Sequence, residues 1–289
     1  MDLFLQQIAN GVVIGSTYAV VAIGFSLAFT VLRVINFAHP DTFMVGMFAG
    51  LTAGRMISDN IFVVLLGGAL GAGAVGLALE RAVIRPLRGR DVLMTLIGTL
   101  GVAIMLQNGM AALIGPDPVP FPALLPVGLL ALGPLSLSVH QLANVGICIV
   151  ILAAVSYYVR ATKLGRASRA VAERADVAAA FGVDVNLVSR VSIVLASMMA
   201  GFAAVSVGML YGSAWAFVGL LYGLKSFTCM LVAGNRYFEG VMVVALALGV
   251  IEALVTGYVS SSLKDAVAFV VLIGVLYFRP NGLFGSYAT

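Results

Sequence analysis

The feature that most constrains this chain is a series of long apolar runs separated by short polar stretches. A helix needs about 20 apolar residues to cross the hydrocarbon core of a bilayer. Only 10% of the 289 residues are charged and 62% are hydrophobic, whereas a soluble domain has roughly 25% charged residues. The candidate spans are residues 9–32, 42–58, 61–84, 92–114, 141–159, 191–211, 217–233, 241–258 and 266–278. The sequence therefore predicts one all-α polytopic membrane domain over residues 1–289, a bundle of about 8–10 transmembrane helices.

Two basic clusters predict how the spans are oriented. One is "RAVIRPLRGR" at residues 81–90, and the other extends from Arg160 to Arg190. Lys and Arg in short loops mark the cytoplasmic side of a membrane. Two spans separate the clusters, so both can be cytoplasmic, which places the N-terminus outside and, for an odd number of spans, the C-terminus inside. The Pro-rich loop at about 115–140 would then be an irregular external cap, with room for a short interfacial helix.

A charged, Ala-rich stretch interrupts the apolar pattern between Leu164 and Val185. Ala and Arg favour a helix, Gly182 is placed to end it, and Asp184 is placed to cap the next helix. Its expected apolar face is small and ringed by charge, and comprises Val171, Ala175, Ala178, Ala179 and Phe181. Such a face is suited to docking on another protein. The alternative is an amphipathic helix on anionic lipid, which is usually more strongly basic than this stretch.

Several polar residues fall within or beside the predicted spans. Intramembrane charges and amides mark solute paths, or they pair with neighbouring helices as structural contacts. The candidates for a translocation path are Asn36, Gln107, Asn108, Lys225 and Glu252. Glu252 could line such a path or pair with Lys225, and the residues alone leave both interpretations open.

Motifs for catalysis and metal binding are not found. The two histidines, His39 and His140, are far apart, and no Cys-x-x-Cys spacing occurs. The run "GLLYGLKS", residues 219–226, resembles a phosphate-binding loop but has Leu224 where that motif requires Gly. We therefore expect no catalytic residue, metal site, cofactor or nucleic-acid partner, and no ATP hydrolysis by this chain itself.

Five stretches, in order along nearly the whole chain, resemble the permease subunits of branched-chain amino acid ABC importers, the LivH/LivM family, and most of all its LivH type. The stretches are "GVVIGSTYAVVAIGFSLAFTVLRVINFAHPD", "LQNGMAALIGPDPVPFP", "LGRASRAVAERADVAAAFGVDVNLV", "GLKSFTCMLVAG" and "GVIEALVTGYVSSSLKDAVAFVVLIGVLYFRPNGLFG". The resemblance implies a single permease domain whose loop at about 160–190 carries a coupling helix that docks on an ATPase subunit. The residues that it assigns to ATPase coupling are Arg169, Glu173, Arg174, Asp176, Ala179, Ala180, Gly182, Val183 and Asp184.

The same resemblance implies the partners and the mechanism. Two cytoplasmic ATPase subunits would power alternating access, a second permease subunit (a paralogue or a second copy) would complete the path, and an extracytoplasmic solute-binding protein would deliver the solute. The chain would be a multi-pass protein of the bacterial inner membrane. Branched-chain amino acids or similar small solutes are the expected cargo.

Two departures from the family pattern keep other solutes open. Pro40 and Asp41 follow the turn histidine where the family often has Gly and an acidic residue, and "AGNRYFEG", residues 233–240, replaces a Gly-rich stretch. An ABC permease for urea, short amides or aromatic acids is one alternative. A stand-alone ion-coupled transporter is another, with Glu252 as its lone intramembrane carboxylate, but it would have no use for a docking helix.

Overall fold

The fold is a bundle of helices, as the sequence predicts. The computed structural model describes residues 2–126, 128–132, 135–234 and 238–285. Each of the nine predicted spans corresponds to a helix: α1 (Asp2–Leu32), α2 (His39–Met56), α3 (Ile61–Leu79), α5 (Val92–Ile114), α6 (Val139–Ala161), α9 (Val185–Tyr211), α10 (Val218–Ala233), α11 (Phe238–Tyr258) and α12 (Lys264–Phe278). In the described part of the chain, seven helical segments are long and apolar enough to cross a membrane. The 16-residue α10 and the 18-residue α2 are not among them.

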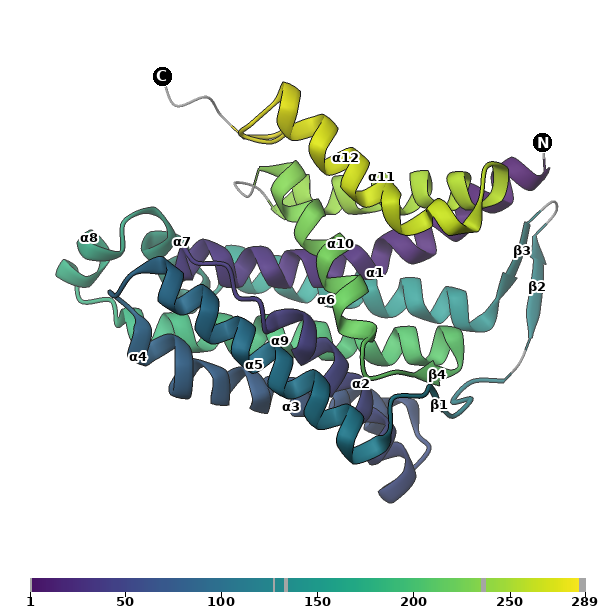
Figure 1. The fold of residues 1–289 in the computed structure, drawn as a ribbon, viewed down its shortest axis with the longest axis horizontal. Coiled ribbons are helices and arrows are strands. Elements are labelled where there is room, and N and C mark those ends of the chain that lie inside the picture. The colour runs from purple at the N-terminus through teal and green to yellow at the C-terminus, as the bar shows by residue number, and fades with distance from the viewer. Residues whose placement is uncertain (1, 127, 133–134, 235–237, 286–289) are drawn as a thin grey trace.

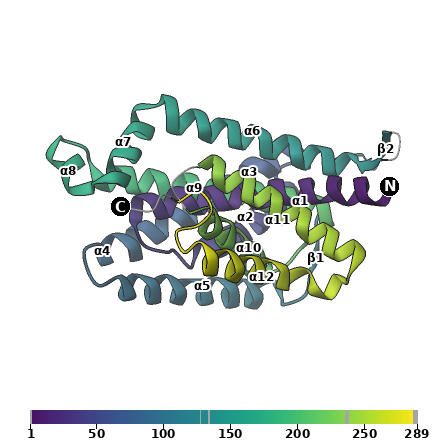
Figure 2. The ribbon, with the colours of Figure 1, turned by 90° about the horizontal axis from the view of Figure 1, so that it is seen from above.

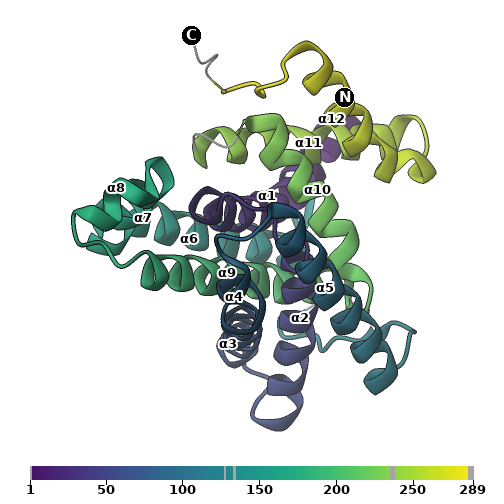
Figure 3. The same cartoon turned by 60° about the vertical axis from the view of Figure 1, so that its left-hand side comes forward.

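The two ends of the bundle differ in character (Figure 1). At one end, the short helices α7 (Lys163–Glu173) and α8 (Ala175–Ala180) project beyond the long helices, as all three views show (Figures 2 and 3). At the other end lie the N-terminus and a β-hairpin. We call these the docking end and the outer end. After α12 the chain returns to the docking end, where the N–H of Leu283 donates to the carbonyl of Val232 at 2.8 Å.

Helix α1 forms the centre of the bundle, packing against α6, α9, α10 and α11. It approaches α11 closely because glycines meet there: a Cβ atom on Gly249 would lie 2.5 Å from the Cα atom of Gly15. A second close seam joins α2, α3 and α9, where a Cβ atom on Gly46 would lie 2.5 Å from the Cα atom of Gly201. Small residues spaced along a membrane helix permit such close packing. The glycines at these two seams therefore have a packing role.

The end of α3 departs from regular α-helix. A π-helical turn, η1 (Glu80–Ile84), follows it and leads into the three-residue helix α4 (Arg85–Leu87). The first of the two basic clusters begins in this turn at Arg81 and continues through α4 to Arg90. The two clusters meet at the docking end, because Arg88 contacts Asn186 in the first turn of α9. Their predicted placement on one side of the bundle is thus consistent with the fold.

The outer loop differs from the expected irregular cap with a possible interfacial helix. Its described residues contain no helix between Ile114 and Val139 and form short strands instead. Strand β1 (Val119–Pro120) pairs with β4 (Ser213–Ala214), and β2 (Leu129–Leu132) pairs with β3 (Leu135–Ser138), all antiparallel. Prolines deprive this loop of the N–H donors that a helix requires, while two-stranded pairing satisfies part of the backbone.

Candidate docking and translocation sites

The docking segment, defined here as residues 163–184, is a pair of helices with sharp ends. Thr162 caps α7, its hydroxyl accepting the N–H of Gly165 at 2.9 Å. Arg174 then adopts an extended backbone conformation, with φ −149° and ψ 98°, and this break separates α7 from α8. The sequence predicted a helix here, and the structure divides it in two.

The end of the docking segment matches the sequence prediction. Gly182 has φ +84°, a left-handed conformation that glycine adopts without strain. Asp184 caps α9, because its Oδ1 atom accepts the N–H groups of Asn186 at 2.9 Å and Leu187 at 3.1 Å. The chain therefore passes from the docking segment into α9 through a fixed turn.

The predicted apolar face of the docking segment is wrong in part. Val171 and Ala178 point inward, at 2% and 5% exposure, and pack with Val31 of α1 and Val188 of α9. The break at Arg174 turns α8 relative to α7, so both residues face the bundle. The apolar residues exposed on the segment are Leu164, Ala170, Ala175, Val177, Ala179, Ala180 and Phe181. Phe181 dominates this surface, with 86% of the residue exposed.

Charged residues surround the exposed face. Arg169, Glu173 and Asp184 are exposed, whereas Val183 is partly buried against the inward cluster. Arg174 and Asp176 form a two-pronged ion pair, with Nε–Oδ1 at 3.1 Å and Nη2–Oδ2 at 2.8 Å. The hydrogen bonds from Arg174 lower the pKa of Asp176 to about 2, and the same contact raises the pKa of Arg174. Both groups are therefore charged at neutral pH.

Arg33 connects the docking segment to α1. It follows the last residue of α1 and has φ +57°, an uncommon conformation for a residue other than glycine. Its guanidinium donates to the backbone carbonyl of Ala172, in the last turn of α7. Carbonyls in a last turn lack helical partners, and a cation there is favoured by the helix dipole. Arg33 thus acts as a cap for α7, supplied by another helix.

A second connection joins the docking end to α3. Arg88 Nη1 lies 2.6 Å from Oδ1 of Asn186, directly after the docking segment. Arg88 Nη2 and Arg190 Nε lie 3.9 Å and 3.6 Å from the carboxylate of Glu80, which is fully buried in the π-helical turn. Burial lowers the pKa of Arg88, and the nearby Glu80 opposes this shift. Glu80 was not among the predicted site residues, although an acidic residue at the end of an apolar run was a signal for it.

The structure brings two of the predicted path residues into direct contact. Lys225 on α10 and Glu252 on α11 are buried, with Nζ and Oε1 2.7 Å apart. Tyr18 of α1 donates to Glu252 Oε2 at 3.0 Å and lies 3.2 Å from Lys225 Nζ. Three helices therefore meet at one buried charge cluster near the middle of the bundle.

The charge cluster extends toward the surface through α12. Asp265 Oδ1 lies 2.8 Å from Lys225 Nζ, and Lys264 Nζ lies 4.0 Å from Glu252 Oε1. Asp265 is about half exposed, whereas Lys225 is almost fully buried. Neither Tyr18 nor Asp265 was among the predicted site residues. A tyrosine in an apolar run is usually a packing residue of the core, so Tyr18 gave no signal. Asp265 lies just outside the predicted span 266–278.

The other predicted path residues lie apart from this cluster. Asn36 is buried and shapes the turn before α2, where its Oδ1 accepts the N–H of Ala38 at 3.0 Å. Gln107 on α5 donates to Oδ1 of Asp41 at 2.9 Å and thereby connects α5 to α2. Asn108 is exposed and donates within its own helix, to the carbonyl of Ile104 at 2.8 Å. The five candidates therefore do not form one site in this conformation.

The phosphate-loop-like run has a structural role. It lies inside α10, where Gly219 and Gly223 pack directly against Pro40. Its backbone amides belong to a helix and form no open loop. Among the described residues, no group of three or more His, Cys, Asp and Glu side chains could hold a metal.

Comparison with known proteins identifies the family. Residues 7–276 match the model of a protein family described as "branched-chain amino acid transport system / permease component". The chain belongs to this permease family. The permease is 34% identical to the high-affinity branched-chain amino acid transport system permease protein LivH of Salmonella typhimurium, over 98% of this chain and 96% of that protein. It is 32% identical, with the same coverage, to the permease protein BraD of Pseudomonas aeruginosa.

A solved structure supports the fold. PsaBC from Streptococcus pneumoniae, in complex with a Fab, aligns with a TM-score of 0.51 at 12% identity, covering 97% of this permease and 93% of that chain. The predicted resemblance to the LivH type and the all-α membrane fold are thus confirmed. The protein is a multi-pass transport permease, a component of a larger transport system.

Proposed function

We propose that this chain is the membrane-spanning subunit of an ABC importer that moves branched-chain amino acids or similar small solutes by ATP-driven alternating access. The observation that carries the proposal is the docking segment. Its inner face is buried against α1 and α9, while Phe181 is exposed at its tip. A large exposed aromatic surrounded by charged residues is typical of a protein interface. The names of the relatives support the solute class.

The proposed partners follow from the two ends of the bundle. Two ATPase subunits would bind at the docking end, on the cytoplasmic side, where the basic residues of 81–90 also lie. A solute-binding protein would dock at the outer end, over the β-hairpin. The chain would lie in the bacterial inner membrane, surrounded by lipid.

The exposed face of α5 supports the proposal that a second permease subunit binds this chain. Asn108 is exposed in the second half of this span, at a depth where a polar side chain facing lipid is unfavourable. Gln107 beside it contacts Asp41. We propose that this face meets the partner permease, either a paralogue or a second copy. Asn36, Gln107 and Asn108 would then lie near the path between the two subunits.

The charge cluster of Lys225 and Glu252 is the proposed moving element of the path. It joins α10 and α11 to α1. Arg33, directly after α1, donates to the carbonyl of Ala172 and so connects α1 to the docking segment. A displacement of the docking segment can therefore reach the cluster along a single rigid helix. ATP and solute would act by binding the outward and inward conformations with different affinities.

The test is co-purification of the tagged chain from its native host in mild detergent, followed by mass spectrometry. Recovery of an ATPase and a second permease subunit in fixed ratio would support the proposal. Recovery of the chain alone, with transport in liposomes in the absence of ATP, would refute it in favour of a stand-alone transporter.

A further inference from the structure

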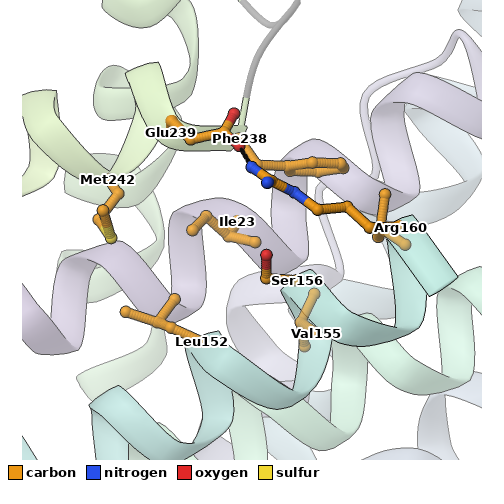
Figure 4. A pocket seen from close by; sticks show the side chains of 9 residues that line it. Ile23, Leu152, Val155, Ser156, Arg160, Phe238, Glu239 and Met242 are labelled. Atoms are coloured by element: carbon orange, nitrogen blue, oxygen red, sulfur yellow. Dashed lines mark hydrogen bonds and ion pairs between the residues drawn. The ribbon is translucent and has the colours of Figure 1, made fainter.

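A small pocket lies at the docking end, apart from the charge cluster. Figure 4 shows it between α1, α6 and α11. Its volume is about 100 Å³. Most of its wall is apolar and is formed by Ile23, Leu152, Val155, Phe238 and Met242.

The polar side of this pocket carries one positive and one negative charge. Arg160, near the end of α6, pairs with Glu239, in the first turn of α11, and the hydroxyl group of Ser156 lies close by (Figure 4). The pair is exposed, with 64% and 57% of the two side chains accessible. Exposed ion pairs contribute little to stability, so a ligand can separate this pair at small cost.

We propose that this pocket binds an aliphatic α-amino acid. The ligand carboxylate would replace Glu239 on Arg160, and the ligand ammonium would replace Arg160 on Glu239. Each charge of the protein thus keeps a partner of opposite sign. The side chain would enter the apolar wall. The pocket is smaller than the roughly 150 Å³ cavity that accepts benzene, so a branched aliphatic chain fits better than an aromatic ring.

The position of the pocket gives such binding a consequence. Arg160 lies two residues before Thr162, which caps the docking segment. An amino acid between Arg160 and Glu239 would detach α11 from the helix that leads into that segment. Solute that has accumulated on the docking side would therefore slow further import. This part of the inference rests on the proposed function, and the binding site itself can be tested without it.

The test measures direct binding to the purified full-length chain in lipid nanodiscs, without a solute-binding protein. The probes are L-leucine, leucinol, which lacks the carboxylate, 4-methylpentanoate, which lacks the ammonium group, and L-phenylalanine. Each ligand charge would pair with one exposed protein charge, so we expect leucine to bind about two- to fivefold tighter than either truncated analogue. We also expect phenylalanine to bind more weakly than leucine.

Two variants assign the two charges. Arg160→Gln should weaken leucine binding and remove the preference for leucine over leucinol. Glu239→Gln should weaken it and remove the preference over 4-methylpentanoate. Arg55→Gln, which changes an exposed arginine at the outer end, is the matched control and should bind leucine like the parent. Unchanged preferences in the first two variants, or no leucine binding by the parent chain, would overturn the inference.

A transport assay keeps this inference separate from the proposed function. If the assembled system imports leucine, and internal leucine inhibits the parent but not Glu239→Gln, the inhibitory role is supported. If it imports leucine and internal leucine has the same effect on both proteins, the inhibitory role is wrong although the importer function stands. If no aliphatic amino acid is imported, the solute class in the proposed function is wrong.

Discussion

The Nζ atom of Lys225 lies between two carboxylates, 2.7 Å from Glu252 and 2.8 Å from Asp265. Lys225 therefore keeps a partner if Glu252 is neutralised. If Lys225 is removed, the partners that Glu252 keeps among the described residues are Tyr18 and the more distant Lys264. A buried charge left without a partner is strongly destabilising. The arrangement thus predicts that removing the charge of Lys225 destabilises the protein more than neutralising Glu252.

Lys225→Met should destabilise the protein by about 3–5 kcal/mol, because it leaves Glu252 buried without its nearest cation. Glu252→Gln should cost clearly less. The double variant should recover much of the stability while solute uptake stays impaired. Thermal unfolding in detergent and uptake in proteoliposomes measure the two effects. Normal uptake in Glu252→Gln would remove Glu252 from the translocation path.

Arg33 should be required for coupling more than for stability. Arg33→Ala removes the bond to the carbonyl of Ala172, and we expect a stability loss of about 1 kcal/mol but a marked rise in ATP hydrolysed per solute imported. Arg33→Gly removes the backbone strain of the left-handed conformation. It should raise the ratio of ATP hydrolysed to solute imported as much as Arg33→Ala does, since it also lacks the guanidinium. Arg33→Lys should restore part of the coupling.

The control for Arg33 is Arg55, which lies in the last turn of α2, is exposed, and donates to a distant backbone carbonyl, that of Pro120. Arg55→Ala should leave the ratio of ATP to solute unchanged. Equal ratios in the Arg33 and Arg55 variants would show that the contact to α7 does not transmit movement.

Phe181 should be the main contact of the docking segment with its ATPase partner. Phe181→Asp replaces an exposed aromatic, so the permease should fold normally while its affinity for the ATPase falls about 30-fold or more, as expected for an interface hot spot. Leu129→Asp, at an exposed apolar position of the outer hairpin, is the matched control. Binding assays with purified subunits give both affinities, and equal affinities would contradict the docking role.

The glycine seam between α1 and α11 should tolerate no added methyl group. Gly249→Ala would place its Cβ atom against the backbone of Gly15, and a stability loss of about 1–3 kcal/mol is expected. Gly274→Ala in α12 meets open space, so it should be neutral or slightly stabilising. The stabilities of the two variants are compared by thermal unfolding in the same detergent. A neutral Gly249→Ala would mean that the two helices can separate freely.

The sequence predicted the elements of this fold better than their contacts. Apolar runs located all nine helices, and Gly182 and Asp184 located the turn into α9, because these features depend on local chemistry. The inward orientation of Val171 and Ala178 depends on the break at Arg174, which no residue preference indicated. The pairing of β1 with β4 was missed because it joins residues 95 positions apart, Val119 with Ala214.

The sequence indicated which types of residue form the candidate site, but not which of them contact one another. Lys225 and Glu252 were recognisable as intramembrane charges, but Tyr18 and Asp265 join them only through the packing of α1 and α12. Arg33 and Arg160 contact residues that are distant in the sequence, Ala172 and Glu239, so no local pattern predicted these contacts. Glu80 did have a local signal, as an acidic residue at the end of an apolar run, but its contacts with Arg88 and Arg190 depend on the packing of the helices. Glu239 lies at the edge of the segment that departs from the family pattern, and its pairing with Arg160 gives that departure a structural role.

The most direct test is leucine uptake by proteoliposomes that contain this chain, its co-purified permease and ATPase partners, and the solute-binding protein. The account predicts uptake that requires ATP and is lost in Phe181→Asp, with the parent membrane fold retained. Uptake that proceeds without ATP, or that is unaffected by Phe181→Asp, would contradict the claim that the docking segment couples this permease to an ATPase.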